Sequence, residues 1–239
     1  MRTTPPMPFL PVLHAELLKI RTVRSHLVAL CAVLPVTVGF SVLAARGDGS
    51  SAEDPLFSAF FGVTFGQIAV VAFATAVVSA EFRDGALRVT LAAVPCRVRW
   101  FAAKALAVAL PVLLVGLVTG VACGCAAAHP LSAGEQVRGA VGCGVYLTLM
   151  ALAAVGVAAV LRSGVATLGL LIPLLLSVSF VIGDMSGTLA DALPDRAGQV
   201  VLHSGSDGAF GMWSGLAVTA AWAAAALLAG TGRVRGCDA

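Results

Sequence analysis

The chain has 239 residues, of which 59% are hydrophobic and only 11% are charged. An average soluble domain carries about 25% charged residues, and the mean hydropathy here is +0.98, so most of the chain is expected to lie in lipid. This composition excludes soluble enzymes, nucleic-acid-binding domains and disordered linkers, although the formal net charge is +3. We expect one transmembrane domain over residues 1–239, an all-α polytopic fold without a nucleotide-binding domain.

The first predicted element is an amphipathic helix over residues 9–25. Leu10, Leu13, Leu17 and Ile20 recur at helical spacing and share one face. Basic amphipathic helices of this kind lie in the plane of the lipid headgroups. The segment is therefore predicted to anchor the chain beside the membrane, with contact to a cytoplasmic partner as the alternative.

Six apolar runs follow, and each is long enough to cross the roughly 30 Å hydrocarbon core, which takes about 20 residues. The predicted spans are 27–45, 56–80, 101–128, 137–161, 164–183 and 209–229. Lys104 and Arg138 fall just inside two of these runs, and their long side chains are expected to reach outward to water. Gly62 and Gly66, four residues apart, indicate close helix packing first and a dimerisation face second.

The cationic residues orient the spans, because Lys and Arg accumulate in cytoplasmic loops. With the N-terminus inside, twelve of the 15 Lys and Arg residues become cytoplasmic, and only Arg46, Arg138 and Arg196 lie outside. Most acidic residues fall outside: Asp48, Glu53, Asp54, Glu135, Asp184, Asp191, Asp195 and Asp207. Six spans then place both termini in the cytoplasm, with a cytoplasmic loop at 81–100 and an external loop at 184–208.

The cytoplasmic loop carries more than the positive charge that orientation requires. Glu81, Arg83, Asp84 and Arg88 give mixed charge at helical spacing, and a second basic cluster follows Pro95. The basic cluster alone fits a loop that only sets topology. The acidic residues and the short amphipathic stretch fit a surface that docks a soluble partner.

Several kinds of chemistry are missing. Both lysines, Lys19 and Lys104, follow apolar residues, so the chain has no G-x-x-x-x-G-K-[ST] phosphate-binding loop. Ion-coupled transport is disfavoured because the deep parts of the runs hold no carboxylate or histidine to bind an ion. The six cysteines show no metal-ligand spacing and are interpreted as apolar thiols, with a metal or redox site as the alternative. We therefore predict no catalytic residue and no metal site.

The sequence resembles the membrane subunits of type-2 ATP-binding-cassette (ABC) exporters. The resemblance rests on six spans, on the basic arm "AELLKIRTVRS", and on "SAEFRDGALRVTLAAVPCRVRWFAAKAL", which is similar to the first cytoplasmic loop of that family. It implies a permease that forms the translocation pathway and pairs, as a homodimer or heterodimer, with a second permease and with separate ATPase subunits. ATP and magnesium would bind in the partner ATPase, and this chain would hold no cofactor.

The resemblance also implies roles for particular residues. The coupling loop that contacts the ATPase corresponds to Glu81, Phe82, Arg83, Asp84, Gly85, Ala86, Leu87 and Arg88. The connecting helix, a second contact, corresponds to Glu16, Lys19, Arg21 and Arg24. By position in the second and fifth spans, Thr64, Gln67, Ser177 and Ser179 are candidates to line the substrate path. Short helices are expected to re-enter the membrane from the external loop, with "TLADAL" and "QVVLH" as candidate pieces.

The predicted function is therefore export of a drug, lipid, peptide or polymer across a membrane in which lipid is the other partner. The excess of arginine over lysine and the abundance of Ala, Gly and Val suggest a GC-rich bacterial genome, hence a multi-pass protein of the bacterial cytoplasmic membrane. The alternative is a non-transporting membrane protein, such as a peptide-toxin immunity factor or an assembly scaffold. Dependence on ATP separates the two hypotheses.

Overall fold

The computed structural model describes residues 8–46, 54–83, 86–94, 96–127, 130–178, 192–205 and 211–236. Within these ranges the secondary structure is helical, without a strand. The elements in chain order are α1 (Phe9–Thr22), α2 (Arg24–Ala45), α3 (Pro55–Phe60), α4 (Val63–Ser79), η2 (Ala80–Phe82), α5 (Ala86–Ala93), α6 (Arg97–Cys125), α7 (Ala133–Leu161), α8 (Gly164–Pro173), η3 (Leu174–Val178), α11 (Pro194–Gln199), η4 (Val200–Leu202) and α12 (Met212–Arg235).

Five helical segments of the described chain are long and apolar enough to cross a membrane. They are Arg24–Ala45, Pro55–Phe82, Arg97–Cys125, Ala133–Leu161 and Met212–Arg235. The chain is thus an all-α, multi-pass membrane protein. The sixth predicted span begins as the shorter apolar helix Gly164–Leu176, and its predicted end at residue 183 lies outside the described residues.

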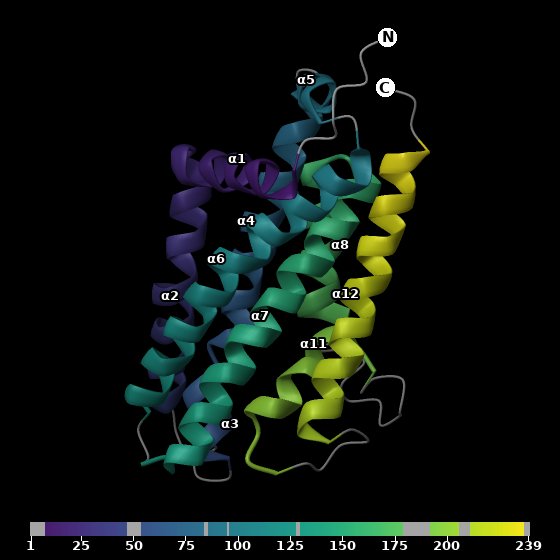
Figure 1. Ribbon diagram of the computed structural model, residues 1–239. Helices are drawn as coiled ribbons and strands as arrows, with labels where there is room; N and C mark the ends of the chain where they lie inside the picture. Colours follow the sequence, from purple (N-terminus) through teal and green to yellow (C-terminus); the bar gives the residue numbers. More distant parts are fainter. Residues whose placement is uncertain are drawn as a thin grey trace.

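The long helices run side by side, and α1 lies across one end of the bundle (Figure 1). Helix α5 lies beyond the long helices at that same end, whereas α3 and α11 lie toward the opposite end (Figure 1). Helix α7 is the centre of the fold, because it packs against α6 on one side and α12 on the other. We call the end that carries α1 and α5 the basic end.

Glycines allow α7 to approach α6 and α12 closely. A Cβ added at Gly156 of α7 would overlap the backbone of α12 at Ala226, and one added at Gly120 of α6 would meet the Cα of Ala140 at 2.6 Å. Gly62 is used in the same way, since its Cβ would overlap the carbonyl of Thr37 on α2. Because Gly62 packs within the chain, the packing interpretation of its motif is confirmed.

The short elements α11 and η4 lie deep beside α4, α7 and α12. Trp222 donates a hydrogen bond from Nε1 to the carbonyl of Ala192 at 3.0 Å, and this tryptophan lies about 15 Å along α12 from its start at the rise of an α-helix. Gly198 packs against the ring of Tyr146, which lies about 20 Å along α7 from its first residue. The "QVVLH" piece of the predicted external loop therefore turns back into the bundle, while most of "TLADAL" lies outside the described residues.

Helices α7 and α8 are joined by a turn of two residues. Arg162 ends α7 in the left-handed region at φ 55°, and the Ser163 side chain then accepts a hydrogen bond from the Ala166 N–H at 3.3 Å to begin α8. The Arg162 guanidinium lies 5.6 Å from the centroid of the Phe82 ring. This turn therefore contacts the segment that leads into α5.

Candidate functional site

Cationic side chains gather at the basic end, on α1, on the start of α6 and on the end of α12. The described cationic residues of this end are Lys19, Arg21, Arg24, Arg83, Arg97, Arg99, Lys104, Arg162, Arg233 and Arg235. The described acidic residues there are Glu16 and Glu81, and both are buried. The surface charge of the basic end is therefore positive over the described residues.

Glu16, Lys19, Glu81 and Lys104 form what we call the charge cluster, which joins α1, η2 and α6. The Lys104 Nζ lies 2.7 Å from a Glu81 carboxylate oxygen and forms a close ion pair with Glu16. The Lys19 Nζ lies 3.0 Å from both Glu16 and Glu81. Two cations thus face two carboxylates, so the cluster is neutral.

Burial makes this arrangement costly to break. Glu16 and Lys104 are each 2% exposed and Glu81 is 6% exposed. Removing one partner from such a buried ion pair leaves an uncompensated charge and costs about 3–5 kcal/mol. The charge cluster therefore holds α1 firmly across the end of α6.

Lys19 is the partly exposed member of the charge cluster, with 43% of its side chain accessible. Partial burial opposes its charge, but its hydrogen bonds to Glu81 and Glu16 outweigh that effect and raise the pKa of Lys19 above its ordinary value of 10.5. Lys19 therefore remains cationic at physiological pH.

The charge cluster continues into α5, the helix of the predicted coupling loop. The Thr90 hydroxyl donates to the second Glu81 carboxylate oxygen at 3.2 Å, and it also lies within hydrogen-bond distance of the Ala86 carbonyl. Glu81 thereby contacts side chains of α1, α5 and α6 at once. A displacement of α5 would therefore disturb the contacts of the Glu81 carboxylate with α1 and α6.

The predicted coupling-loop residues fall into two groups in the structure. Arg83 is exposed, Phe82, Ala86 and Leu87 are half-buried, and the Glu81 carboxylate is turned inward. Asp84 and Gly85 lie outside the described residues, and Arg88 is described only as part of α5. The exposed surface of α5 includes Val89, which is 75% exposed.

The predicted connecting-helix residues divide in the same way. Arg21 and Arg24 are exposed, whereas Glu16 is buried in the charge cluster. The expectation that Lys104 reaches outward is wrong, because its side chain points inward between the two glutamates. Two buried carboxylates provide more favourable partners for the ammonium group than a long reach to the headgroups.

The path candidates Thr64 and Gln67 belong to a second polar group, near the turned-in segment. The Thr64 hydroxyl donates to the Gln199 side-chain carbonyl at 3.1 Å, and the Gln199 amide donates to the Tyr146 hydroxyl at 3.2 Å. Tyr146 in turn donates to the side-chain carbonyl of Gln67. Gln67 is completely buried, and its Nε2 has no hydrogen-bond partner among the described residues.

This polar group ties α4, α7 and α11 together inside the bundle. The side chain of Ser177 and the whole of Ser179 lie outside the described residues, so the structure brings together two of the four path candidates. Sequence reasoning missed Gln199 as the residue that links them. The available signal was an amide side chain in an otherwise apolar piece of the predicted external loop.

Asp54 binds the end of the turned-in segment, which comprises α11 and η4, at the end of the bundle opposite the basic end. Its carboxylate accepts hydrogen bonds from the Phe57 N–H at 3.0 Å and from the Ser204 hydroxyl at 2.8 Å, and it lies 2.9 Å from the His203 Nδ1. Burial opposes the Asp54 charge, but these hydrogen bonds lower the pKa of Asp54 below its ordinary value of 3.8. The Phe57 ring also stacks on His203 at 4.2 Å.

The described part of the chain holds no cluster of three or more metal-ligating side chains. Five cysteines in that part are free thiols, and Cys123 and Cys143 are buried in the apolar core. The positions of Cys123 and Cys143 fit the interpretation of these thiols as apolar side chains, whereas Cys31, Cys96 and Cys125 are exposed.

Comparisons with known proteins do not assign the chain to a family. No protein-family model matches the sequence, and no curated protein matches it significantly.

Proposed function

We propose that the chain is the permease subunit of an ABC transporter, which forms the translocation pathway and couples to a separate ATPase to export a substrate. The observation that carries this proposal is the junction at Glu81. One buried carboxylate binds Lys19 of α1, Thr90 of α5 and Lys104 of α6. A partner that moves α5 would therefore move α1 and a membrane-spanning helix together, since coupling travels through contiguous hydrogen-bonded and packed groups.

The shape and charge of the basic end support this function. Helix α5 lies beyond the bundle (Figure 1), and it presents an apolar residue, Val89, together with the neighbouring exposed cation Arg83. Interfaces of this kind combine a small apolar contact with a polar rim. In this proposal Arg83, Arg21 and Arg24 contact the ATPase directly, while Glu16, Glu81 and Lys19 position the two docking helices.

The proposed topology has six spans, with the basic end in the cytoplasm of a bacterial cell. Its support is the accumulation of arginine at the basic end, together with the bias of Lys and Arg toward cytoplasmic loops. The sixth span would start at α8. Two such chains, or this chain and a second permease, would form the path between them, and ATP and magnesium would bind in the ATPase.

The first experiment is affinity purification of the tagged chain from native membranes in mild detergent, followed by mass spectrometry. A stoichiometric subunit with a phosphate-binding loop, whose ATPase activity rises when the permease is present, supports the proposal. Function that persists without any ATPase would reject it in favour of an immunity factor or a scaffold.

The second experiment tests the docking surface with the double charge reversal Arg83→Glu and Arg88→Glu. We expect loss of ATPase co-purification and of transport, with membrane insertion and thermal stability unchanged. Arg233→Glu is a control for charge reversal elsewhere on the same end, because Arg233 is an exposed cation on α12. Normal transport by the double variant would reject the docking assignment.

A further inference from the structure

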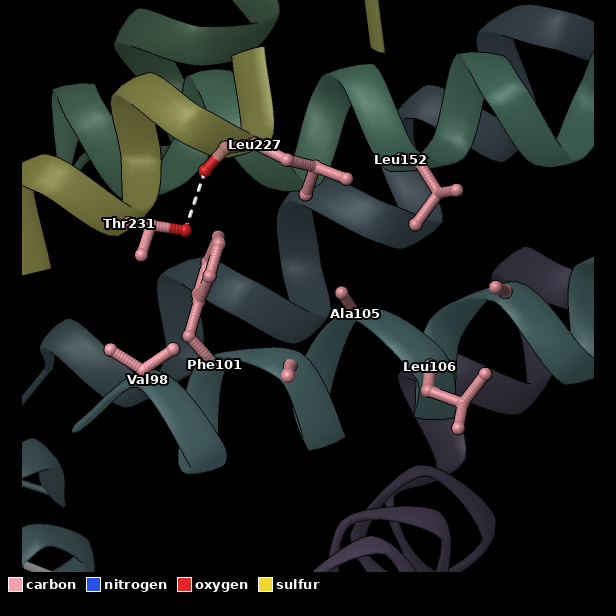
Figure 2. A pocket seen from close by; sticks show the side chains of 9 residues that line it. Val98, Phe101, Ala105, Leu106, Leu152, Leu227 and Thr231 are labelled. Carbon is pink, nitrogen blue, oxygen red and sulfur yellow. Dashed lines mark hydrogen bonds between the residues drawn. The ribbon is translucent and has the colours of Figure 1, made fainter. Parts of the chain in front are cut away.

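An apolar hollow of about 360 Å³ lies between α6, α7 and α12 near the basic end. Its volume is within the range of about 300–1,000 Å³ that small-molecule sites occupy. Figure 2 shows Phe101, Ala105 and Leu106 of α6 on one side of the hollow, and Leu152 of α7 with Leu227 and Thr231 of α12 on the other side. The Thr231 hydroxyl is the polar side-chain group of this wall, and it donates to the Leu227 carbonyl at 2.7 Å (Figure 2).

Because that hydroxyl is already satisfied within its own helix, the wall presents hydrocarbon to an occupant. A polar cargo would lose its hydration there without gaining hydrogen bonds, at a cost of at least about 1 kcal/mol per group. A hydrocarbon chain has no hydrogen bonds to water to lose, so it avoids this cost. The wall therefore selects for an apolar chain.

Two arginines, Arg97 and Arg235, follow the hollow toward the basic end. Arg97, one turn before Phe101 on α6, donates from Nη1 to the Val234 carbonyl at 3.2 Å and so bridges α6 to the last turn of α12. Arg235 follows Leu227 and Thr231 at intervals of four residues, which places it on the same face of α12 one turn beyond the hollow. Arg235 is exposed, and within the described ranges no acidic side chain forms an ion pair with it.

We propose that this groove is a binding site for an anionic phospholipid, with an acyl chain in the hollow and the headgroup phosphate at Arg235 and Arg97. The chemistry of both parts matches one molecule, an apolar chain that ends in an anion at the membrane surface. Basic pockets between membrane helices bind anionic headgroups in this way. The site is independent of the docking surface on α5 and of any ATPase.

The test is native mass spectrometry of the whole purified chain, incubated with equimolar phosphatidylglycerol and phosphatidylcholine of the same acyl chains. We expect the protein to retain phosphatidylglycerol preferentially. Arg235→Gln should reduce that preference about fivefold, the effect of one arginine near an anionic headgroup. Arg233→Gln is the control for net charge, because Arg233 lies two residues from Thr231 and so on another face of α12.

A second variant tests the hollow without changing charge. Ala105→Leu fills the space and should reduce retention of phosphatidylglycerol, whereas Ala122→Leu, at a half-buried alanine far along α6, should not. Equal retention of the two lipids by the unaltered protein would overturn the proposal. Equal losses for the Arg235 and Arg233 variants would also overturn it, because they would show attraction to the whole basic end.

Discussion

Replacement of Lys104 by methionine tests whether the charge cluster holds α1 to the bundle. Methionine keeps the length and the apolar stem of lysine but removes the ammonium group. Glu16 and Glu81, both almost fully buried, would then share Lys19 alone, and that lysine is 43% exposed. Breaking a buried pair in this way costs about 3–5 kcal/mol.

The matched variant is Lys19→Met, which removes the same charge at the more exposed position of the same cluster. Solvent weakens an ion pair there, so the expected loss is only about 1 kcal/mol. A third variant, Lys104→Met with Glu16→Gln, restores neutrality and should recover part of the stability.

The assay is the fraction of detergent-solubilised protein that remains monodisperse after heating, measured by size-exclusion chromatography. At about 2–4 °C per kcal/mol for a chain of this size, Lys104→Met should lower the apparent midpoint by roughly 10 °C. A midpoint for Lys104→Met equal to or above that of Lys19→Met would refute the reasoning, because burial would then have no bearing on the cost. The reasoning would also be refuted if the variant with both Lys104→Met and Glu16→Gln is less stable than the variant with Lys104→Met alone.

Three further predictions concern other parts of the fold. Gly156→Leu should lower stability by at least about 1–3 kcal/mol, because its side chain would overlap α12, whereas Gly169→Leu, where an added Cβ meets nothing within 4 Å, should have little effect in the same heating assay. Tyr146→Phe should cost about 1–3 kcal/mol in that assay, since it leaves the amides of two glutamines without their shared partner inside the bundle. Because the folded-state pKa of Asp54 is lowered, its contribution to stability is present above about pH 3.8 and is lost as the pH falls through the folded value. In limited proteolysis between pH 6 and pH 3, cleavage near Ser204 should increase toward pH 3. The Asp54→Asn protein should already be cleaved there at pH 6. If that variant is as resistant as the unaltered protein at pH 6, the stabilising role of the Asp54 carboxylate is contradicted.

The membrane-spanning character could be predicted from the sequence because it depends on composition summed over about 20 residues. The packing of Gly62 could be predicted for a similar reason, since small residues four apart permit close approach whatever their partner. A helix over the first segment could also be predicted from its spacing, but the residues that α1 buries are Val12, Glu16 and Ile20, and Leu10 of the predicted apolar face is 74% exposed. The coupling-loop assignments rest on the resemblance and stay predictions.

The contacts between distant segments could not be predicted in the same way. Glu16, Glu81 and Lys104 lie far apart in the chain, and nothing local indicates that they meet. A lysine eight residues into a helix fits an outward reach as well as an inward one, until the positions of two carboxylates are known. Likewise, Gln199 looks like a loop residue until the turned-in segment places it beside Tyr146.

The burial of Lys104 has a practical use. The chain has two lysines, Lys19 and Lys104, and both belong to the charge cluster. An amine-selective reagent can therefore reach the partly exposed Lys19 side chain in the closed structure, although its raised pKa slows the reaction, and it reaches Lys104 only when α1 separates from α6. The ratio of label at Lys104 and Lys19, measured by peptide mass spectrometry, therefore reports on this opening. The measurement requires no introduced probe.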